Sequence, residues 1–492
     1  MLSKLLRHEF RATGRIMLPV YALLLVSCGG CTLFGRLLGR YPESTVLSVV
    51  QTVFATLFGV TTFGMLLLTL VLMVYRFYKN LMTDEGYLMF TLPVSRSQLI
   101  WSKLLVALVW SVLSTVLAAL AWMAEISVVG RENVYDFSLG NPSVPAPDAV
   151  NEAAIRILRE QPELIHCYTS AQGDAAARQR FADSLNRRFG GGYTADQLYI
   201  TVGAAASLCC VFHGLTCPGD EFIVFAPYFP EYKVFIEGAG AKMVLIPPEI
   251  EHFQIDFAAF EQALTPHTKG VVVNSPNNPS GVVYSRETLE RLAEILGRKE
   301  EEYGHPIYLI SDEPYREIVF SGFQAPWIPH LYRDTIVCYS FSKSLSLPGE
   351  RLGYVLVPGQ AADSGEVYAA VAGAGRSLGY VNAPSLFQQV TSLCCDMTAD
   401  LSVYERNCKL LVPALREMGY HVAEPGGAFY LFPRSLEPDD LAFSERAKQF
   451  DLLLVPGSGF GAPGHFRLAY CVQTEMIQRA LPKFQALADS YR

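Results

Sequence analysis

The residues most able to do chemistry lie in segment 340–354, which reads Ser-Phe-Ser-Lys-Ser-Leu-Ser-Leu-Pro-Gly-Glu-Arg-Leu-Gly-Tyr. Lys343 has hydroxyl side chains on both sides, and Arg351 follows eight residues later, beyond a Pro-Gly turn. The flanking segments 336–339 and 354–357 are strand-like, so we expect Lys343 at the end of a buried strand. A lysine placed there, close to groups that bind phosphate, suits a Schiff base with a phosphorylated aldehyde. A lone loop lysine is more often solvated, so this interpretation depends on residues elsewhere.

Three further segments with polar or small residues follow strand-like stretches. The segment Gly-Ala-Ala at 203–205 opens a helix, where backbone N–H groups and the helix dipole would bind a phosphate. Asn278 lies in a loop that two prolines and a glycine restrain, so it could be held rigidly toward a ligand. Asp312 follows another strand, where its carboxylate could pair with a ring nitrogen. Taken singly, a small-residue helix start, a simple turn and a helix cap explain the three segments as well.

These segments need a scaffold that brings them together. From about Val134 onward, short apolar strands alternate with helical patterns such as 204–215 and 286–296. The alternation predicts an α/β fold with a mainly parallel sheet that is covered on both faces. Ligands in such sheets bind beyond the carboxyl ends of the strands. The predicted strands are 197–202, 221–225, 242–246, 270–273, 307–311, 335–339 and 353–357.

In their order along the chain, the motifs of residues 135–491 resemble those of the fold-type I pyridoxal-phosphate-dependent aminotransferases of class I/II. The resemblance implies the corresponding α/β fold, with a large cofactor-binding part at about 175–375. A smaller α+β part would be formed by 131–174 and 376–492. The motifs are Ser-Leu-Gly-Asn-Pro at 138–142, Tyr168 followed by Gly173, the 203–205 turn, Asn-Asn-Pro-Ser-Gly at 277–281, Asp-Glu-Pro-Tyr at 312–315, the lysine segment, and Phe-Arg-Leu at 466–468.

The resemblance implies a role for each of these residues around pyridoxal 5′-phosphate. Lys343 would form the Schiff base and, once the substrate amine has replaced it, would move the proton from the substrate Cα. Asp312 would keep the pyridine nitrogen protonated, because a buried opposite charge favours the cation. The other implied contacts are Asn278 and Tyr315 at the phenolic oxygen, Gly203, Ala204, Ala205, Ser340, Ser342 and Arg351 at the phosphate, Tyr168 at the phosphate of the neighbouring subunit, and Phe229 stacked on the ring, unless Phe229 is only a core aromatic.

The same resemblance implies the substrate contacts and the reaction. Arg467 would bind the substrate α-carboxylate as a planar fork, unless it forms a surface salt bridge. Gly140 and Asn141 match a loop that closes over the substrate. The implied reaction is ping-pong transamination between an amino acid and a 2-oxo acid, in a homodimer with shared active sites. A carbon–sulfur β-lyase or other α-carbon chemistry uses the same cofactor contacts and stays open. A second arginine, for an acidic side chain, is not assignable from the sequence, although Arg376 is a candidate.

Residues 1–130 differ in composition from the rest. They carry ten Lys and Arg against five Asp and Glu, whereas the remainder of the chain is strongly acidic. Their three apolar runs, 16–34, 46–75 and 104–123, each reach the roughly 20 residues that span a bilayer. We therefore predict a membrane segment of about three helices at 1–130, followed by an enzyme unit at 131–492.

Basic residues predict how this segment is oriented. They are concentrated in the N-terminal tail and between the second and third runs, which the positive-inside rule places in the cytoplasm. Three spans would then put the enzyme unit outside, although pyridoxal phosphate and 2-oxo acids are cytosolic. We expect the enzyme unit in the cytoplasm. This requires that run 46–75 forms a re-entrant hairpin, that one of the runs does not span the membrane, or that the two parts of the chain are joined by accident.

Residues 1–130 also resemble the N-terminal part of a bacterial ABC-2-type exporter permease, through 1–10 and 84–95. Such permeases usually have about six spans, so this would be half of one. The third run stands where similar aminotransferases carry a helix that latches onto the partner subunit. A gene fusion or an assembly artefact explains this arrangement. A membrane transport subunit with an inactive enzyme-like domain is a further alternative.

Several other classes of function lack support in the sequence. The acidic region after residue 130 has no basic stripe, so nucleic acid is not an expected partner. The eleven cysteines show neither disulfide-framework nor zinc-site spacing, so we expect reduced thiols and no metal. The glycine-rich segment 456–464 lacks the Lys-Ser/Thr pair that a phosphate-binding P-loop needs.

Overall fold

The structure is a computed structural model that describes residues 2–40, 45–82, 95–132, 134–163 and 165–492. Its internal contacts divide the chain into two compact units, Met1–Val134 and Tyr135–Arg492.

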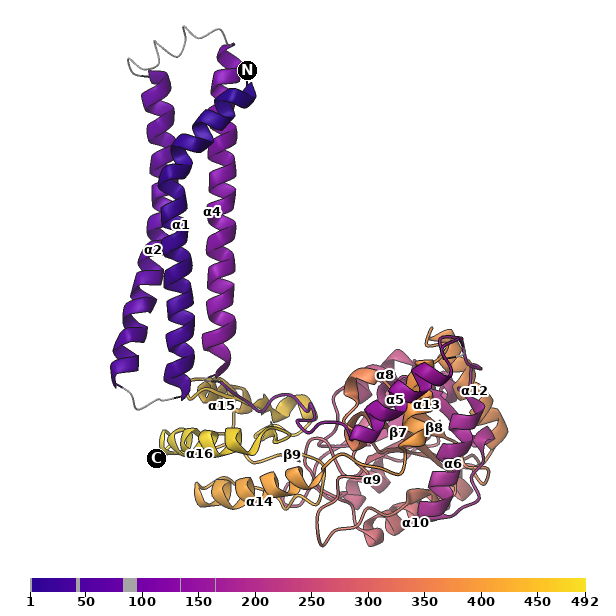
Figure 1. The fold of residues 1–492 in the computed structure, drawn as a ribbon. Helices are drawn as coiled ribbons and strands as arrows, with labels where there is room; N and C mark the ends of the chain where they lie inside the picture. Colours follow the sequence, from indigo (N-terminus) through magenta and orange to yellow (C-terminus); the bar gives the residue numbers. More distant parts are fainter. Residues whose placement is uncertain (1, 41–44, 83–94, 133, 164) are drawn as a thin grey trace. The chain divides into compact units, whose positions relative to one another are not determined.

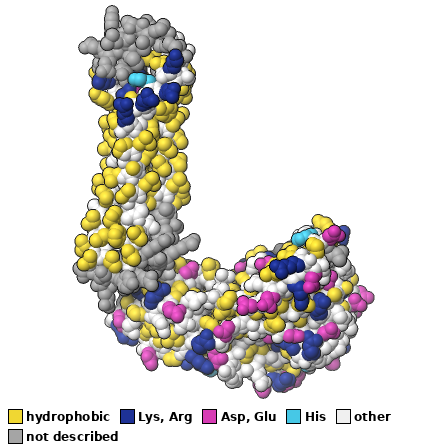
Figure 2. All heavy atoms as spheres, in the orientation of Figure 1, with side chains coloured by type: hydrophobic (Ala, Val, Ile, Leu, Met, Phe, Trp, Pro, Cys, Tyr) yellow, Lys and Arg dark blue, Asp and Glu magenta, His cyan; other side chains and the backbone are white. Residues whose placement is uncertain are grey.

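Three long helices make up the first unit (Figure 1): α1 (Leu2–Arg40), α2 (Thr45–Met82) and α4 (Arg96–Glu132). Helix α1 packs against both of the others. Most of the outward-facing side chains are apolar, and Lys and Arg gather at one end of the unit (Figure 2). The segments that are long and apolar enough to cross a membrane are Leu2–Gly35, Val46–Lys79 and Ser97–Met123, as the three apolar runs predict.

Polar side chains link the three helices inside this unit. Glu9 of α1 is buried, and its Oε1 accepts a hydrogen bond from Lys103 Nζ of α4 at 2.7 Å. Its Oε2 accepts another from Arg76 Nε of α2 at 3.1 Å. Further along the helices, Thr69 Oγ1 lies 2.9 Å from Ser114 Oγ. An unpaired charge or hydroxyl is costly in an apolar interior, so these pairs help to select which helix faces meet.

The second unit contains a seven-stranded sheet in the order β2-β8-β7-β6-β5-β3-β4. Strand β8 runs antiparallel to both of its neighbours, and the pairs among β7, β6, β5, β3 and β4 are parallel. The mainly parallel sheet predicted from the sequence is therefore confirmed, and all seven predicted strands are present. Their bounds are β2 Leu198–Thr201, β3 Glu221–Phe225, β4 Lys242–Ile246, β5 Thr268–Asn274, β6 Tyr308–Asp312, β7 Thr335–Ser340 and β8 Gly353–Leu356.

Helices cover both faces of this sheet. On β3, Phe222 and Val224 pack with α7, α8 and α12, whereas Ile223 and Phe225 pack with α9 and α10 on the other face. Both faces of the inner strands are buried, which is why strands such as β3, β5 and β6 are largely apolar rather than alternating, whereas the edge strand β4 is partly exposed. The covering helices are α5 (Asp148–Glu160), α6 (Ala175–Phe189), α7 (Ala204–Leu215), α8 (Glu231–Gly238), α9 (Phe257–Ala263), α10 (Arg286–Tyr303), α12 (Ser364–Ser377) and α13 (Ser385–Leu393).

Helix α10 (Arg286–Tyr303) continues about two turns beyond the predicted end at residue 296. The added segment is rich in Lys and Glu, which are good helix formers. The helix therefore continues where the apolar periodicity that predicted it has ended. The helix ends at Gly304, which takes the left-handed conformation with φ 75°.

A second core lies beside the sheet region within this unit. It is built from the sheet β11-β12-β9, the pair β1-β10 and three helices, around buried aromatic side chains such as Phe429 and Phe466. The elements are β1 Tyr135–Asp136, β9 Tyr430–Leu431, β10 Leu452–Leu453, β11 Val455–Pro456, β12 Phe466–Ala469, α14 Ser402–Glu417, α15 Asp440–Lys448 and α16 Thr474–Asp489.

The packing divides this unit differently from the boundaries drawn from the sequence. We placed 131–174 and 376–492 together in the smaller part. Helices α5 and α13 instead share a core with α6 and strands β2, β7 and β8 of the large sheet. The smaller part therefore consists of the first residues of the unit and of the chain after α13. Sequence order alone does not show this, because α5 and α13 meet only in the folded chain.

Candidate active site

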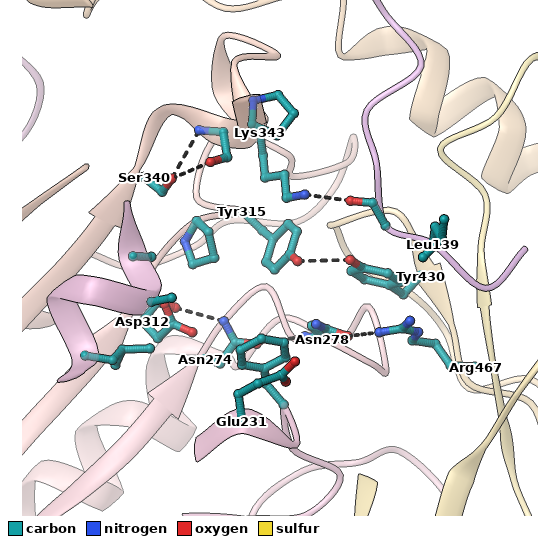
Figure 3. A pocket seen from close by; sticks show the side chains of 18 of the residues that line it. Leu139, Glu231, Asn274, Asn278, Asp312, Tyr315, Ser340, Lys343, Tyr430 and Arg467 are labelled. Carbon is teal, nitrogen blue, oxygen red and sulfur yellow. Dashed lines mark hydrogen bonds between the residues drawn. The ribbon is translucent and has the colours of Figure 1, made fainter. Parts of the chain in front are cut away.

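A cavity of about 340 Å³ opens at the carboxyl ends of β5, β6 and β7 (Figure 3). Ligands of open α/β sheets bind at this edge, because the strands end there and the loops are free to carry side chains. The second core contributes Tyr430 and Arg467, so the cavity is bounded by both cores of the unit. The polar lining residues are Ser138, Glu231, Asn274, Asn278, Asp312, Tyr315, Ser340, Ser342, Lys343, Arg351, Tyr430 and Arg467.

Lys343 points into this cavity from the short helix α11 (Phe341–Ser344), which follows β7 directly. Its Nζ donates a hydrogen bond to the Gly140 carbonyl at 2.6 Å and lies 5.3 Å from the centre of the Phe429 ring. Burial lowers the pKa of Lys343 to about 8, and the charges of Arg351 and Arg467 act in the same direction. Far more of this amine is therefore uncharged and nucleophilic near neutral pH than of an ordinary lysine, although the charged form still predominates at pH 7.

Asp312 is the last residue of β6, and its carboxylate is fully buried. Tyr232 donates its hydroxyl hydrogen to Oδ2 at 2.5 Å. The other oxygen, Oδ1, is buried and has no hydrogen-bond partner among the residues that the structure describes. Burial raises the pKa of Asp312 to about 7. A buried carboxylate oxygen without a partner fits the protonated ring nitrogen of a pyridine cofactor, whose charge would lower that pKa.

The N-terminus of α7 provides a site for an anion at another side of the cavity. Ala204 and Ala205 line the cavity there, and Gly203 precedes them with φ 92°. The positive φ favours glycine at this position, and a Cβ atom there would lie 2.9 Å from Arg351 Nη2, so a larger residue would also displace the guanidinium. Arg351 itself has φ 54°, an uncommon conformation outside glycine that aims its side chain at the turn. Backbone N–H groups and a guanidinium are the groups that bind phosphate.

Two serines complete the lining beside Lys343. Ser340 Oγ accepts a hydrogen bond from the backbone N–H of Ser342 at 3.2 Å, and the two hydroxyls lie 2.8 Å apart. Both residues are buried at the end of β7. Their hydroxyls can donate to a phosphate held at the start of α7.

Arg467 occupies the side of the cavity formed by the second core. Its Nη2 donates to the Ser138 carbonyl at 2.6 Å, and its Nη1 donates to Asn278 Oδ1 at 3.2 Å. Its guanidinium carbon lies 5.0 Å from the centre of the Tyr430 ring. Within the described residues, Arg467 Nε is buried without a hydrogen-bond partner. The guanidinium is held in place and keeps donor capacity for a carboxylate.

Most of the residues predicted from the sequence meet at this cavity. Gly203 does not line the cavity itself but lies next to Arg351, which does. Asn141 and Tyr168 are not among the lining residues. Tyr168 is 90% exposed in the single chain, and Arg376 is exposed on α12. The predicted residues that line the cavity are Gly140, Ala204, Ala205, Phe229, Asn278, Asp312, Tyr315, Ser340, Ser342, Lys343, Arg351 and Arg467.

Several residues that hold this arrangement are not predicted from the sequence. Tyr430 lies with its hydroxyl 3.0 Å from that of Tyr315. Asn274 donates through Nδ2 to the Asp312 carbonyl at 2.9 Å and accepts from the Asn278 N–H at 2.7 Å. The available signal for Asn274 was its place at the end of a predicted strand, as for Asp312. Tyr430 carries no such signal, because it lies on β9 (Tyr430–Leu431), far along the chain from the strands of the large sheet, and meets Tyr315 only in the folded chain.

Known proteins resemble this chain over its second unit. The sequence model of the family described as "Aminotransferase class I and II" matches residues 132–484. An aspartate aminotransferase of Thermotoga maritima is 32% identical over 372 residues, which cover 75% of this chain and 94% of that protein. An aspartate/prephenate aminotransferase of Thermus thermophilus is 31% identical over 70% of this chain and 88% of that protein.

A solved structure agrees with these relatives. The crystal structure of an amino transferase from Eubacterium rectale has 47% sequence identity and a TM-score of 0.73. The match covers 83% of this chain and 99% of that one. The chain therefore belongs to the aminotransferase class I and II family, and it is an enzyme that depends on pyridoxal 5′-phosphate.

Proposed function

We propose that Lys343 binds the aldehyde of pyridoxal phosphate as a Schiff base and that the enzyme transfers the amino group of an α-amino acid to a 2-oxo acid. The cofactor supplies an electron sink for the negative charge that develops at the substrate Cα. One observation carries the proposal. A buried amine with a lowered pKa, Lys343, shares a cavity with the buried Asp312, whose Oδ1 has no partner among the described residues.

The groups around the cavity suit the parts of this cofactor. Asp312 Oδ1 would accept the ring N–H, and Asn278 and Tyr315 would donate to the phenolic oxygen. Phe229, which lines the same cavity, would stack on the ring. The phosphate would be held by the N–H groups at the start of α7, by Ser340 and Ser342, and by Arg351.

Two residues would act on the substrate. Arg467 would bind the α-carboxylate through two N–H groups, giving up its contact with Asn278 or using its partnerless Nε. This contact would orient the Cα–H bond toward the amine of Lys343. After the substrate amine has displaced it from the cofactor, Lys343 Nζ would take the proton from Cα and return it to the cofactor carbon.

A half-reaction tests transamination directly. The protein loaded with pyridoxal phosphate is mixed with one amino acid, without an acceptor, and its absorbance near roughly 400–430 nm is followed. Loss of this band, with one 2-oxo acid formed per site and the amino form of the cofactor left behind, is the expected result. Pyruvate and a thiol from a sulfur-containing donor would instead identify a carbon–sulfur β-lyase.

Lys343→Ala tests the covalent role of this lysine. We expect the variant to lack the absorbance band and the half-reaction, while Lys409→Ala, which changes an exposed lysine of α14, keeps both. An unchanged band in Lys343→Ala would contradict the proposal and favour a domain without this enzyme activity.

A further inference from the structure

The charged groups of the cavity do not all have a role in the proposed reaction. Five charged side chains line it: Glu231, Asp312, Lys343, Arg351 and Arg467. The proposed function assigns the last four to the ring nitrogen, the aldehyde, the phosphate and the α-carboxylate. Among the described residues, no fourth cationic side chain lines the cavity, and Glu231 remains without a role.

Glu231 is the first residue of α8 and follows Phe229 by two positions. It lies on the side of the cavity where Asn278 and Arg467 are found, opposite Lys343 (Figure 3). Its charge reaches Tyr430: burial raises the pKa of Tyr430 to about 12, and the Glu231 carboxylate adds to that increase. Tyr430 in turn packs against Arg467.

Glu231 is solvent-exposed. It forms no ion pair with any residue that the structure describes, although exposed glutamates of the same unit do, for example Glu237 with Lys233. A side chain carried by a substrate at Arg467 would extend from the Cα toward this part of the cavity. A side-chain carboxylate would meet a like charge there, and a side-chain ammonium would meet an opposite one.

We infer that Glu231 makes this site selective for amino donors whose side chain carries a positively charged nitrogen, and selective against aspartate and glutamate. The inference rests on the proposed transamination and adds the substrate class to it. It separates this chain from the relatives named aspartate aminotransferases, for which a dicarboxylic amino acid is the named substrate. The relevant sequence signal is one residue, a glutamate directly after Pro-Tyr-Phe-Pro at 227–230.

The test compares two donors of similar length and opposite side-chain charge, L-ornithine and L-glutamate. The half-reaction of the full-length, cofactor-loaded protein is measured as kcat/KM for each donor. We expect a ratio in favour of ornithine of at least about tenfold, and a fall in that ratio of about tenfold in Glu231→Gln. Glu237→Gln removes one charge from the same helix, away from the cavity, and should leave the ratio at its original value.

A second measurement does not depend on turnover. Glutarate and 5-aminopentanoate have the same length, lack the α-amino group and differ only at one end. Titration calorimetry should show tighter binding of 5-aminopentanoate, and Glu231→Gln should remove that preference. This readout also detects a variant that binds normally but reacts poorly.

The outcomes separate the two proposals. If no amino acid converts the cofactor, the transamination proposal fails, and the inference fails with it. If donors react but glutamate or aspartate is preferred, transamination stands and the inference is overturned. A preference for ornithine that is unchanged in Glu231→Gln also overturns it, because another group must then be responsible.

Discussion

Burial shifts the pKa values of two groups in the cavity in opposite directions, and in both cases it favours the uncharged form. It lowers the pKa of Lys343 to about 8 and raises that of Asp312 to about 7, because each loses solvation of its charged form. Both groups are therefore less charged near neutral pH than they would be in water. The neutral amine is ready to attack an aldehyde, and the charge of a protonated ring nitrogen beside Asp312 would lower the pKa of that carboxyl and favour its charged form. Strongly shifted groups that share a cavity are typical of functional sites.

The role of Asp312 predicts the effect of Asp312→Asn. The amide has the same shape but no negative charge, so it cannot stabilise a protonated ring nitrogen. We expect kcat of the half-reaction to fall at least roughly 100-fold, the scale for one preorganised electrostatic contact at a reacting centre. The absorbance band of the bound cofactor should persist, because Lys343 is unchanged. Wild-type kcat in this variant would contradict the assignment.

The lowered pKa of Lys343 predicts a pH dependence of cofactor uptake. Only a neutral amine attacks an aldehyde, and an amine is mostly neutral at a pH above its pKa. The rate at which cofactor-free protein reacts with pyridoxal phosphate should therefore rise with pH and level off above about 8. Stopped-flow absorbance across this range measures it. A rate that still rises toward 10.5, the ordinary value for lysine, would show that Lys343 is not perturbed.

At the level of elements, the large sheet is the part that sequence patterns predict best. Its strands are short, mostly apolar and bounded by turns, and the three neighbouring parallel strands β5, β6 and β7 end in the polar residues Asn274, Asp312 and Ser340. Parallel strands share their carboxyl edge, so residues at those ends must be neighbours. The three long helices of the first unit are predicted equally well from their apolar runs, but the ends of these helices are not. They continue into polar segments, where hydropathy falls while helix propensity remains.

The ion pair inside the three-helix unit predicts how that unit responds to mutation. Glu9→Gln leaves Lys103 buried without its partner, so we expect a loss of about 3–5 kcal/mol in the stability of the helix packing. Thermal unfolding in detergent micelles measures this. The double variant Glu9→Gln/Lys103→Met removes the buried pair, leaves only the partly exposed Arg76 without its partner, and should recover much of the loss. Arg7→Gln, at an exposed position of α1, is the matched control and should change little.

At the level of the whole molecule, enzymes of this family are usually dimers. The single chain leaves the proposed phosphate site open, because Arg351 is exposed there. Tyr168 is 90% exposed, which suits a residue that would act on the neighbouring subunit. We propose that Tyr168 contacts the phosphate bound to the other subunit.

A shared site predicts complementation between two defective chains. Tyr168→Ala should weaken cofactor binding roughly 10- to 100-fold, the loss expected for one hydrogen bond to a charged group. Lys343→Ala should be inactive. In mixed dimers, one site would combine the intact Tyr168 of one chain with the intact Lys343 of the other. Coexpression should then restore about one quarter of wild-type activity at limiting cofactor. Activity no higher than that of the separate variants would show that the site is not shared.

The location of the enzyme unit is a further prediction for the whole molecule. We expect it in the cytoplasm, where its cofactor and 2-oxo acids are found. All cysteines that the structure describes after residue 134 are free thiols, as suits a reducing compartment. A reporter that is active only in the cytoplasm should therefore be active when it is fused after residue 130. This result would require that not all three long helices cross the membrane from a cytoplasmic N-terminus. The resemblance of residues 1–130 to an exporter permease stays a prediction.

The sequence by itself determined the strands, the order of the motifs and the residues at the strand ends, including Lys343, Asp312 and Arg351. These features are local: they depend on hydrophobic pattern, turn residues and the shared edge of parallel strands. The tertiary structure alone decided what surrounds them. Tyr430 meets Tyr315 because segments far apart in sequence share the second core, and Glu231 lines the cavity because α8 begins near the carboxyl ends of the large-sheet strands. Burial, and with it the perturbed pKa values and the charge that selects a substrate, exists only after that packing.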